Sequence, residues 1–247
     1  MVLLLRVVLD ACASLGRRTD PSPQRTGSRV WPGADQAVHE TSAEVGSVRN
    51  QWYADHRDLV KWGTLLRLAA TRDLRSIIQV AYLTPDSAPT VIDSELGQAP
   101  VDARVLDHFR NIHRISELCA PAGPRIHVFD LPFSARGRQD YACAVIAQIR
   151  ALVPRPAAVF LDPDTGLAEK PASAKHVTSD EVAAIWSVLE PADWLVLYQH
   201  AAREKDWLNS RRASFAGACG GARVVTFRAT SVPRDVAFFA ARRGTTA

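Results

Sequence analysis

Two carboxylates that follow a short apolar run are the residues best placed to do chemistry. The run Ala157–Leu161 contains only apolar residues, and the sequence Asp162-Pro163-Asp164-Thr165-Gly166 comes directly after it. A carboxylate at a strand end can accept a proton, hold a ligand amine or bind a cation, and two carboxylates held close together favour a positive partner. Asp162 and Asp164 are therefore candidate catalytic residues, although an Asx turn that caps the following segment would use the same side chains.

A second polar cluster, Tyr198-Gln199-His200, ends the next apolar run along the chain. Neighbouring strands of one sheet often pair, so we expect His200 to lie near the two aspartates as an acid/base or anion-binding partner. A strand-end histidine satisfied by backbone carbonyls explains His200 equally well. Three further residues are expected to contact the substrate, namely Thr165, Lys175 and Arg203.

A third cluster lies near the start of the first predicted helix, in the segment Tyr53–Trp62. Asp58 and Lys61 are one helical turn apart, so helix capping and a surface ion pair explain them without any function. Lys61 nevertheless stands within a run of large apolar residues, where a solvated ammonium is unexpected. Both interpretations of Lys61 stay open.

The elements that must position these clusters alternate between helical and extended patterns. Helices are predicted at 58–72, 102–119, 135–152, 179–189 and 202–216, and strands at 76–84, 125–131, 157–162, 193–200, 222–230 and 235–241, with a loop at 85–100. This alternation predicts an α/β fold with a doubly wound, mostly parallel, Rossmann-like sheet. The last two strands predict a C-terminal antiparallel hairpin, a feature of methyltransferase-like sheets. Ligands of such sheets bind beyond the carboxyl ends of the strands.

Length and composition fit one globular domain. The chain has 247 residues, of which 47% are hydrophobic, and this is enough for a single core. Residues 16–46 lack sustained periodicity. We therefore expect residues 1–47 to be disordered, or to be an extension that results from a misplaced start, and residues 48–247 to form one α/β domain.

Charge, cysteines and missing motifs narrow the classes of function. The net charge of +4 allows a mild attraction to polyanions. The four cysteines lie far apart without metal-ligand spacing, which predicts reduced thiols and a cytoplasmic protein. No segment has the roughly 20 apolar residues of a membrane helix, so no membrane partner is expected. Glycine-rich phosphate loops, G-x-S-x-G and H-E-x-x-H are absent, which leaves the corresponding enzyme classes unsupported.

Five segments, taken together, resemble a widespread bacterial family of uncharacterised proteins. They are Tyr53–Gly63, Tyr82–Asp86, Phe160–Leu167, Lys175–Val177 and Tyr198–His200, and the resemblance covers about residues 49–212. More remotely, the same order of motifs is similar to the J-type 23S rRNA adenine-N6 methyltransferases. That resemblance implies a methyltransferase fold and S-adenosylmethionine as cofactor.

Individual motif positions carry the more remote resemblance. Enzymes of that type open with a His-x-Asp-x-x-Lys element, which His56, Asp58 and Lys61 match, and the resemblance implies that Lys61 approaches the cofactor. Their Asp-Pro-Pro-Tyr motif, in which the Asp holds the target amine, is matched only at Asp162 and Pro163. The aromatic residue of that motif, whose stacking on a base is worth about 1–3 kcal/mol, has no counterpart here.

The leading interpretation is a methyltransferase-like protein that binds S-adenosylmethionine or a related nucleoside and acts on nucleic acid or a nucleotide. In this interpretation Asp162 and Asp164 orient the acceptor, His200 assists proton removal, and no metal is needed. The expected cofactor pocket consists of His56, Asp58, Lys61, Thr84 and Asp86, although Thr84-Pro85-Asp86 lacks the glycine-rich turn of such pockets. Two alternatives stay open: a Mg²⁺-dependent phosphoesterase or nuclease that uses the two aspartates, and a non-catalytic partner protein that retains the fold.

Overall fold

The computed structural model describes residues 56–83, 91–94, 97–100, 112–168, 172–228 and 235–245. All of them belong to the compact unit Gly46–Ala247. The expectations for residues 1–47, and for Thr84 and Asp86, lie outside the described residues.

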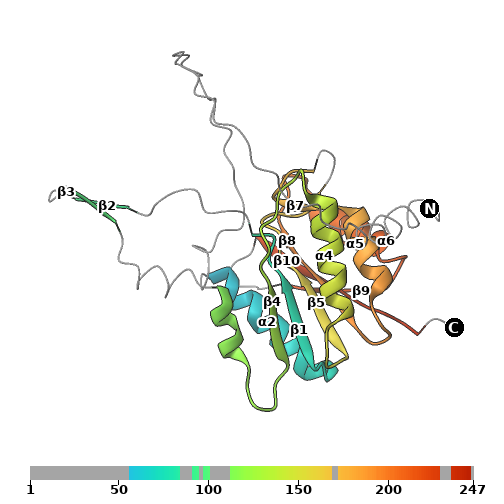
Figure 1. Ribbon diagram of the computed structural model, residues 1–247. Coiled ribbons are helices and arrows are strands. Elements are labelled where there is room, and N and C mark those ends of the chain that lie inside the picture. The colour runs from blue at the N-terminus through green and yellow to red at the C-terminus, as the bar shows by residue number, and fades with distance from the viewer. Residues whose placement is uncertain are drawn as a thin grey trace, which may run out of the picture. The chain divides into compact units, whose positions relative to one another are not determined.

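Six strands form the central sheet, in the order β4-β1-β5-β8-β10-β9. Their bounds are β1 Ser76–Val80, β4 Arg125–Phe129, β5 Ala157–Leu161, β8 Trp194–His200, β9 Val224–Phe227 and β10 Val236–Arg242. The first four strands in this order are parallel, whereas β10 runs antiparallel to both of its neighbours. The predicted doubly wound, mostly parallel sheet with a C-terminal antiparallel hairpin is thereby confirmed (Figure 1).

Helices cover both faces of the sheet. On one face lie α2 (His56–Arg72) and the 3₁₀ helix η2 (Ile112–Leu118), and on the other lie α4 (Arg138–Arg150), α5 (Ser179–Val188) and α6 (Trp207–Ala218). In Figure 1, α4, α5 and α6 follow one another along their face, as the contacts of α5 with both neighbours require. Alternate residues of the central strands divide between the two layers, which is why these strands are mostly apolar on both faces.

The strand order changes direction between β1 and β5. The chain goes from β1 to β4 on one side and then returns to β5 on the other side of β1. Such a switch point leaves a crevice beyond the carboxyl ends of the two strands, because the connections leave in opposite directions. Any ligand site of this sheet is expected at the ends of β1 and β5.

Two small sheets were not predicted. The loop expected at 85–100 contains an antiparallel pair of strands, β2 (Val91–Ser94) and β3 (Gly97–Pro100), so this part of the prediction is wrong. Directly after β5, β6 (Gly166–Leu167) pairs in parallel with β7 (His176–Val177). Through the β6–β7 pair, the turn that carries Asp162 and Asp164 is hydrogen-bonded to a second segment of the chain.

Several boundaries differ from the predicted ones for identifiable reasons. Helix α2 begins at His56, so Asp58 lies in its first turn and does not cap it. Thr178, just before the predicted start at 179, caps α5, because its hydroxyl accepts from the Glu181 amide while the Glu181 carboxylate accepts from the Thr178 amide. In the described part of the helix predicted at 102–119, the chain forms the 3₁₀ helix η2, and its last residue, Leu118, is 44% exposed.

Cysteines and helix lengths add two findings. Cys119 is an exposed free thiol and Cys219 a buried one, whereas Cys143 is disulfide-bonded. The expectation of four reduced thiols is therefore wrong for Cys143, because separation along the sequence does not limit which cysteines meet in the fold.

Across the described ranges, none of the helices combines the length and the apolar character that a membrane crossing requires.

Candidate functional site

A group of three buried polar side chains lies at the switch point of the sheet. The Lys61 ammonium, from α2, is 3.0 Å from Asp162 Oδ2, at the end of β5. The amide Nε2 of Gln79, from β1, donates to the same oxygen at 2.7 Å. Lys61 also donates to Asp58 Oδ1 at 2.9 Å. We call Asp58, Lys61, Gln79 and Asp162 the switch-point cluster.

Because Lys61 and Asp162 are buried, the charge of each affects the protonation of the other. Only 8% of Lys61 and 2% of Asp162 is exposed. Desolvation lowers the pKa of Lys61, but Asp162 and Asp58 raise it, and the net pKa lies above its ordinary value. Burial raises the pKa of Asp162, and the neighbouring ammonium of Lys61 opposes that shift. Two carboxylates around one ammonium keep the lysine protonated, and the pair is held as an ion pair out of water.

Gln79 leaves one acceptor of the cluster without a partner. Its amide nitrogen must face Asp162, because a carboxylate can only accept, and the orientation of the amide is thereby fixed. The other end, Oε1, is buried and has no hydrogen-bond partner. An unpaired buried carbonyl costs about 1–3 kcal/mol, so such an atom in a folded protein calls for an explanation.

A second polar chain starts beside Lys61 and runs outward to the surface. The Lys61 ammonium lies 5.0 Å from the centroid of the Tyr198 ring. The Tyr198 hydroxyl is 2.8 Å from His200 Nε2. His200 Nδ1 is 3.6 Å from Asp235 Oδ2, to which Arg57 donates at 2.9 Å. His200 is thus linked to the switch-point cluster through the tyrosine ring.

The surroundings of His200 favour its neutral form. Burial lowers the pKa of His200 and Arg57 lowers it further, while Asp235 and Asp164 act in the opposite direction. Burial raises the pKa of Tyr198, so the tyrosine keeps its proton, and in the tautomer with a hydrogen on Nδ1, the nitrogen nearer Asp235, the hydroxyl donates to Nε2. With Nε2 engaged in this way, the Nδ1 hydrogen faces Asp235. His200 can receive a proton at Nε2 only after the Tyr198 hydroxyl turns away.

The turn that carries Asp164 is fastened to the end of β8. The amide of His200 donates to the Thr165 carbonyl at 2.9 Å. The Gln199 side chain accepts from the amide of Leu167 and donates to the Thr165 carbonyl. Gly166 adopts a φ of +119°, and a Cβ there would lie 2.4 Å from Gln199 Oε1. Only glycine fits this position, so the shape of the turn depends on Gly166.

The carboxyl end of β1 carries backbone strain. Tyr82 has a φ of 49°, in the left-handed region that a bulky residue rarely adopts. Its amide donates to the Tyr141 hydroxyl at 3.1 Å, and its ring packs edge-on against Phe133 at 5.1 Å. Strain of this kind costs about 1–3 kcal/mol and persists where the surroundings fix the backbone, often at functional sites. Glycine is the residue that most readily adopts the left-handed geometry found here at Tyr82.

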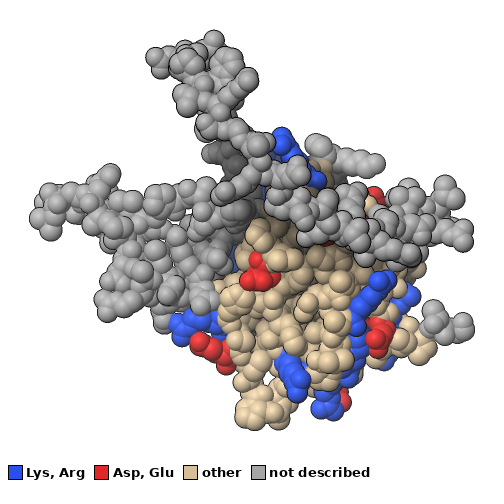
Figure 2. Space-filling view, viewed as in Figure 1, with Lys and Arg blue, Asp and Glu red and all other residues tan. Residues whose placement is uncertain are grey.

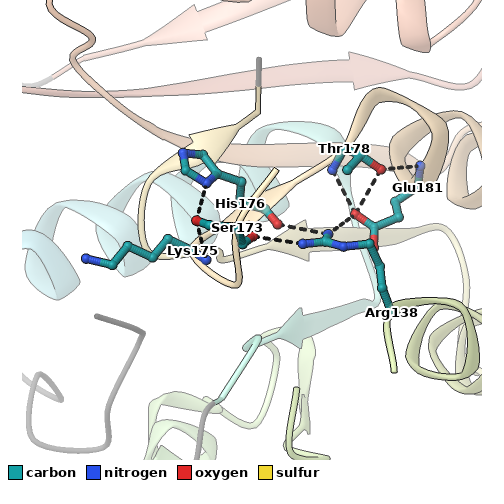
Figure 3. A network of polar contacts seen from close by, with 6 residues as sticks. All are labelled: Arg138, Ser173, Lys175, His176, Thr178 and Glu181. Carbon is teal, nitrogen blue, oxygen red and sulfur yellow. Dashed lines mark hydrogen bonds and ion pairs between the residues drawn. The ribbon is translucent and has the colours of Figure 1, made fainter. Parts of the chain in front are cut away.

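A separate network holds the β6–β7 pair from the other face of the sheet (Figure 3). Arg138, at the start of α4, donates to Glu181 Oε2 at 2.7 Å and to the carbonyls of Ser173 and His176 at 2.8 and 3.0 Å. Figure 3 shows the Lys175 side chain extending away from this network, while its amide donates to Ser173 Oγ. These contacts assign Arg138 and Glu181 a structural role.

The structure brings together some predicted site residues and leaves others apart. Asp58, Lys61 and Asp162 meet directly, and His200 reaches them through Tyr198. Asp164 and Thr165 are half-buried in the adjacent turn. Arg203 is exposed, and Lys175 contacts the turn only through its backbone carbonyl, which accepts from the Thr165 amide. Nothing is described of the His56 side chain.

Sequence reasoning missed the roles of Gln79 and Asp235. Gln79 is a polar residue inside the otherwise apolar run Ile77–Val80, and that interruption was the available signal. Asp235 follows a segment that gave no pattern, so nothing in the sequence connected it with His200. Within the described residues, no three His, Cys, Asp or Glu side chains gather where they could hold a metal ion.

Comparisons with known proteins give a limited result. No family model and no curated protein matches the sequence. A solved structure of a candidate methyltransferase from Thermobifida fusca aligns at 12% identity over 77% of this chain and 80% of that one, with a TM-score of 0.41. A DUF574 family protein from Streptomyces avermitilis aligns at 11% identity over 76% and 82%, with a TM-score of 0.40. These scores are too low to bear on function, which has to be argued from the site.

Proposed function

We propose that this chain is a methyltransferase-like protein that binds S-adenosylmethionine or a related nucleoside at the carboxyl ends of β1 and β5. Nucleic acid or a nucleotide is the proposed substrate. The observation that carries the proposal is the unpaired Gln79 Oε1 beside the buried Asp162 carboxylate, at the switch point of the sheet. Two adjacent acceptors at this position suit a ligand that presents N–H groups.

The charges of the switch-point cluster fit such a ligand. The Asp162 carboxylate and the unpaired Gln79 Oε1 place two acceptors beside one ammonium, that of Lys61. S-adenosylmethionine carries a sulfonium and an ammonium group, and nucleosides carry exocyclic amines. A buried carboxylate beside an unpaired carbonyl attracts groups of this kind. Bound S-adenosylmethionine supplies an electrophilic methyl group.

The residues around the cluster have roles that follow from their positions. Lys61 keeps Asp162 ionised and oriented, so it is proposed as a positioning residue. Asp162 and Gln79 Oε1 are proposed to accept from the ligand. Asp164, in the turn fastened to His200, is proposed to orient the acceptor group, and His200 to take up a proton once the Tyr198 hydroxyl has turned away.

The magnesium alternative receives no support from this arrangement. A divalent cation would need oxygens of Asp162 as ligands. Asp162 Oδ2 already accepts from an ammonium and from an amide, and the positive charge of that ammonium disfavours a second cation beside it. No contact in the described residues favours a divalent cation there, and the nucleoside interpretation is the one we develop.

Isothermal titration of the full-length protein with S-adenosylmethionine, S-adenosylhomocysteine and adenosine tests the proposal. We expect saturable heat with at least one of the three. Gln79→Leu should weaken binding about 10-fold, the loss expected for one hydrogen bond to a buried acceptor. Gln139→Leu, an exposed position of α4, is the matched control and should bind like the wild type. Absence of heat with all three ligands, or equal weakening by both variants, would contradict the proposal.

A further inference from the structure

The edge of the sheet opposite the switch-point cluster carries a row of arginines. Five of the six strands have an arginine at this end or within two residues of it. In the order of the sheet they are Arg125 of β4, Arg75 of β1, Arg155 of β5, Arg242 of β10 and Arg223 of β9. In Figure 1 this amino edge of the parallel strands faces downward, and Figure 2 shows several Lys and Arg side chains along the same lower rim, with Asp and Glu side chains between them.

Backbone hydrogen bonds hold neighbouring members of the row at strand spacing. The Arg125 amide donates to the Arg75 carbonyl at 2.9 Å, and the Arg75 amide donates to the Pro156 carbonyl, next to Arg155, at 2.7 Å. Strands of a sheet lie about 4.7–4.9 Å apart, so the row from β4 to β9 spans roughly 24 Å. The arginines therefore form a line on a rigid support.

Most of these charges are not used by the fold. Arg155 is the exception, since it pairs with Glu190 and with the fully buried Asp193 that precedes β8. Arg75 has only an exposed partner, Asp73, at 3.3 Å, and exposed pairs contribute about 0–1 kcal/mol. Among the described residues, no carboxylate lies within ion-pair distance of Arg125, Arg223 or Arg242, and all three are exposed.

Helix dipoles account for other arginines on this edge but not for the row. Arg72 and Arg150 are the last residues of α2 and α4, where a cation offsets the negative end of the helix. Arg72 also lies over the ring of Trp194, at 5.3 Å. Arg125 and Arg242 belong to strands and Arg223 directly precedes β9, so this explanation does not apply to them.

We propose that this arginine row binds the phosphate backbone of nucleic acid. A row in which three of the five guanidinium groups have no carboxylate partner in the described part of the chain, and a fourth has only an exposed one, matches a polymer with a regular series of phosphates. Guanidinium binds phosphate through paired hydrogen bonds. The tryptophans near the edge, Trp194 and Trp186, are buried beneath Arg72 and Arg243, so they offer no platform for bases. Binding is therefore expected to be independent of sequence and strongly dependent on salt.

Fluorescence anisotropy with a labelled DNA duplex of mixed sequence tests this surface in the full-length protein. With about four phosphate contacts, affinity should fall about 100-fold between 50 and 200 mM salt. The double variant Arg75→Gln/Arg125→Gln should bind more weakly, with a slope of log affinity against log salt that is shallower by about 2. The matched control replaces two exposed arginines elsewhere, Arg136→Gln/Arg212→Gln, and should keep the wild-type slope.

Three outcomes would overturn the proposal: no duplex binding at low salt, an equal loss in the control variant, or binding to phosphatidylserine vesicles that depends on Arg75 and Arg125 as strongly. The last outcome would assign the row to an anionic lipid surface. The row does not depend on the proposed nucleoside site. Gln79→Leu should keep duplex binding, and the double arginine variant should keep the heat of nucleoside binding, so the two proposals can fail separately.

Discussion

Lys61 Nζ lies 3.0 Å from Asp162 Oδ2, although 101 residues separate the two in the sequence. The contact joins α2 to the end of β5, at the point where the strand order changes direction. A surface ion pair is therefore not the whole explanation of Lys61, because the lysine is buried and contacts Asp162 as well as Asp58, while its role in a ligand site stays a prediction. The proposed function depends on the acceptor atoms that Asp162 and Gln79 present to a ligand.

Removing the ammonium should destabilise the protein strongly. In Lys61→Met, the buried Asp162 carboxylate keeps only the Gln79 amide, and breaking one side of a buried ion pair costs about 3–5 kcal/mol. Urea unfolding monitored by circular dichroism measures the change. Lys205→Met, at an exposed lysine, is the matched control and should lie within about 0.5 kcal/mol of wild type.

A double variant separates the ion pair from the loss of packing. In an Asp162→Asn background the carboxylate charge is gone, so Lys61→Met should cost clearly less than in the wild type. If the two substitutions are additive, Lys61 and Asp162 do not act as a pair, and the electrostatic description of the cluster is wrong.

Gly166→Ala should open the turn that carries Asp164. Alanine is strained at a φ of +119°, and its Cβ would lie 2.4 Å from Gln199 Oε1. A loss of more than about 1 kcal/mol in the free energy of unfolding is expected. Gly63→Ala makes the same change in the middle of α2, where nothing lies within 4 Å of the new Cβ, and should stabilise by roughly 0.5–1 kcal/mol. The free energy of unfolding should change in opposite directions in the two variants. Equal changes would contradict the role described for Gly166.

The sheet could be predicted from the sequence because its strands are uniform. The runs Ile77–Val80 and Ala157–Leu161 are buried on both faces, so no polar alternation obscures them. The β6–β7 pair could not be predicted, since two-residue strands have no period of their own. Their pairing depends on Gln199 and Arg138, which reach them from other elements.

The candidate site was predictable only in its parts. Asp162 and His200 follow recognisable strands, and strand ends converge at one edge of a parallel sheet. The link between them through the Tyr198 ring follows from the alternation of residues along β8, but the choice of rotamers does not. In the sequence, Gln79 is an interruption of a buried strand. Only its contact with Asp162 and its unpaired oxygen make it a candidate site residue.

The contribution of His200 to stability should depend on pH. Because the pKa of His200 in the folded protein lies below 6.5, the unfolded chain binds the proton more readily. The contribution is therefore complete above pH 6.5 and is lost as the pH falls through the folded pKa. His200→Gln should lose less stability than the wild type between about pH 7.5 and pH 5.5. Urea midpoints across this range measure it, and identical pH profiles would show that His200 does not titrate as described.

Arg138→Lys should loosen the β6–β7 pair without removing a charge. Lysine cannot reach the Glu181 carboxylate and two carbonyls at once, as the guanidinium does (Figure 3). We expect a loss of about 1.5–3 kcal/mol. Hydrogen exchange should accelerate at the amides of Thr165 and Ala168, which donate to the segment that Arg138 holds. Arg136→Lys, at an exposed neighbour, should leave both quantities unchanged.

The central claim is that the switch-point cluster receives the ligand, and a crystal structure of the protein grown with S-adenosylmethionine tests it most directly. The account predicts ligand density at the carboxyl ends of β1 and β5, with a ligand nitrogen within hydrogen-bond distance of Gln79 Oε1 or Asp162. Ligand bound elsewhere, with Lys61, Gln79 and Asp162 in unchanged contact and Oε1 still unpaired, would contradict it.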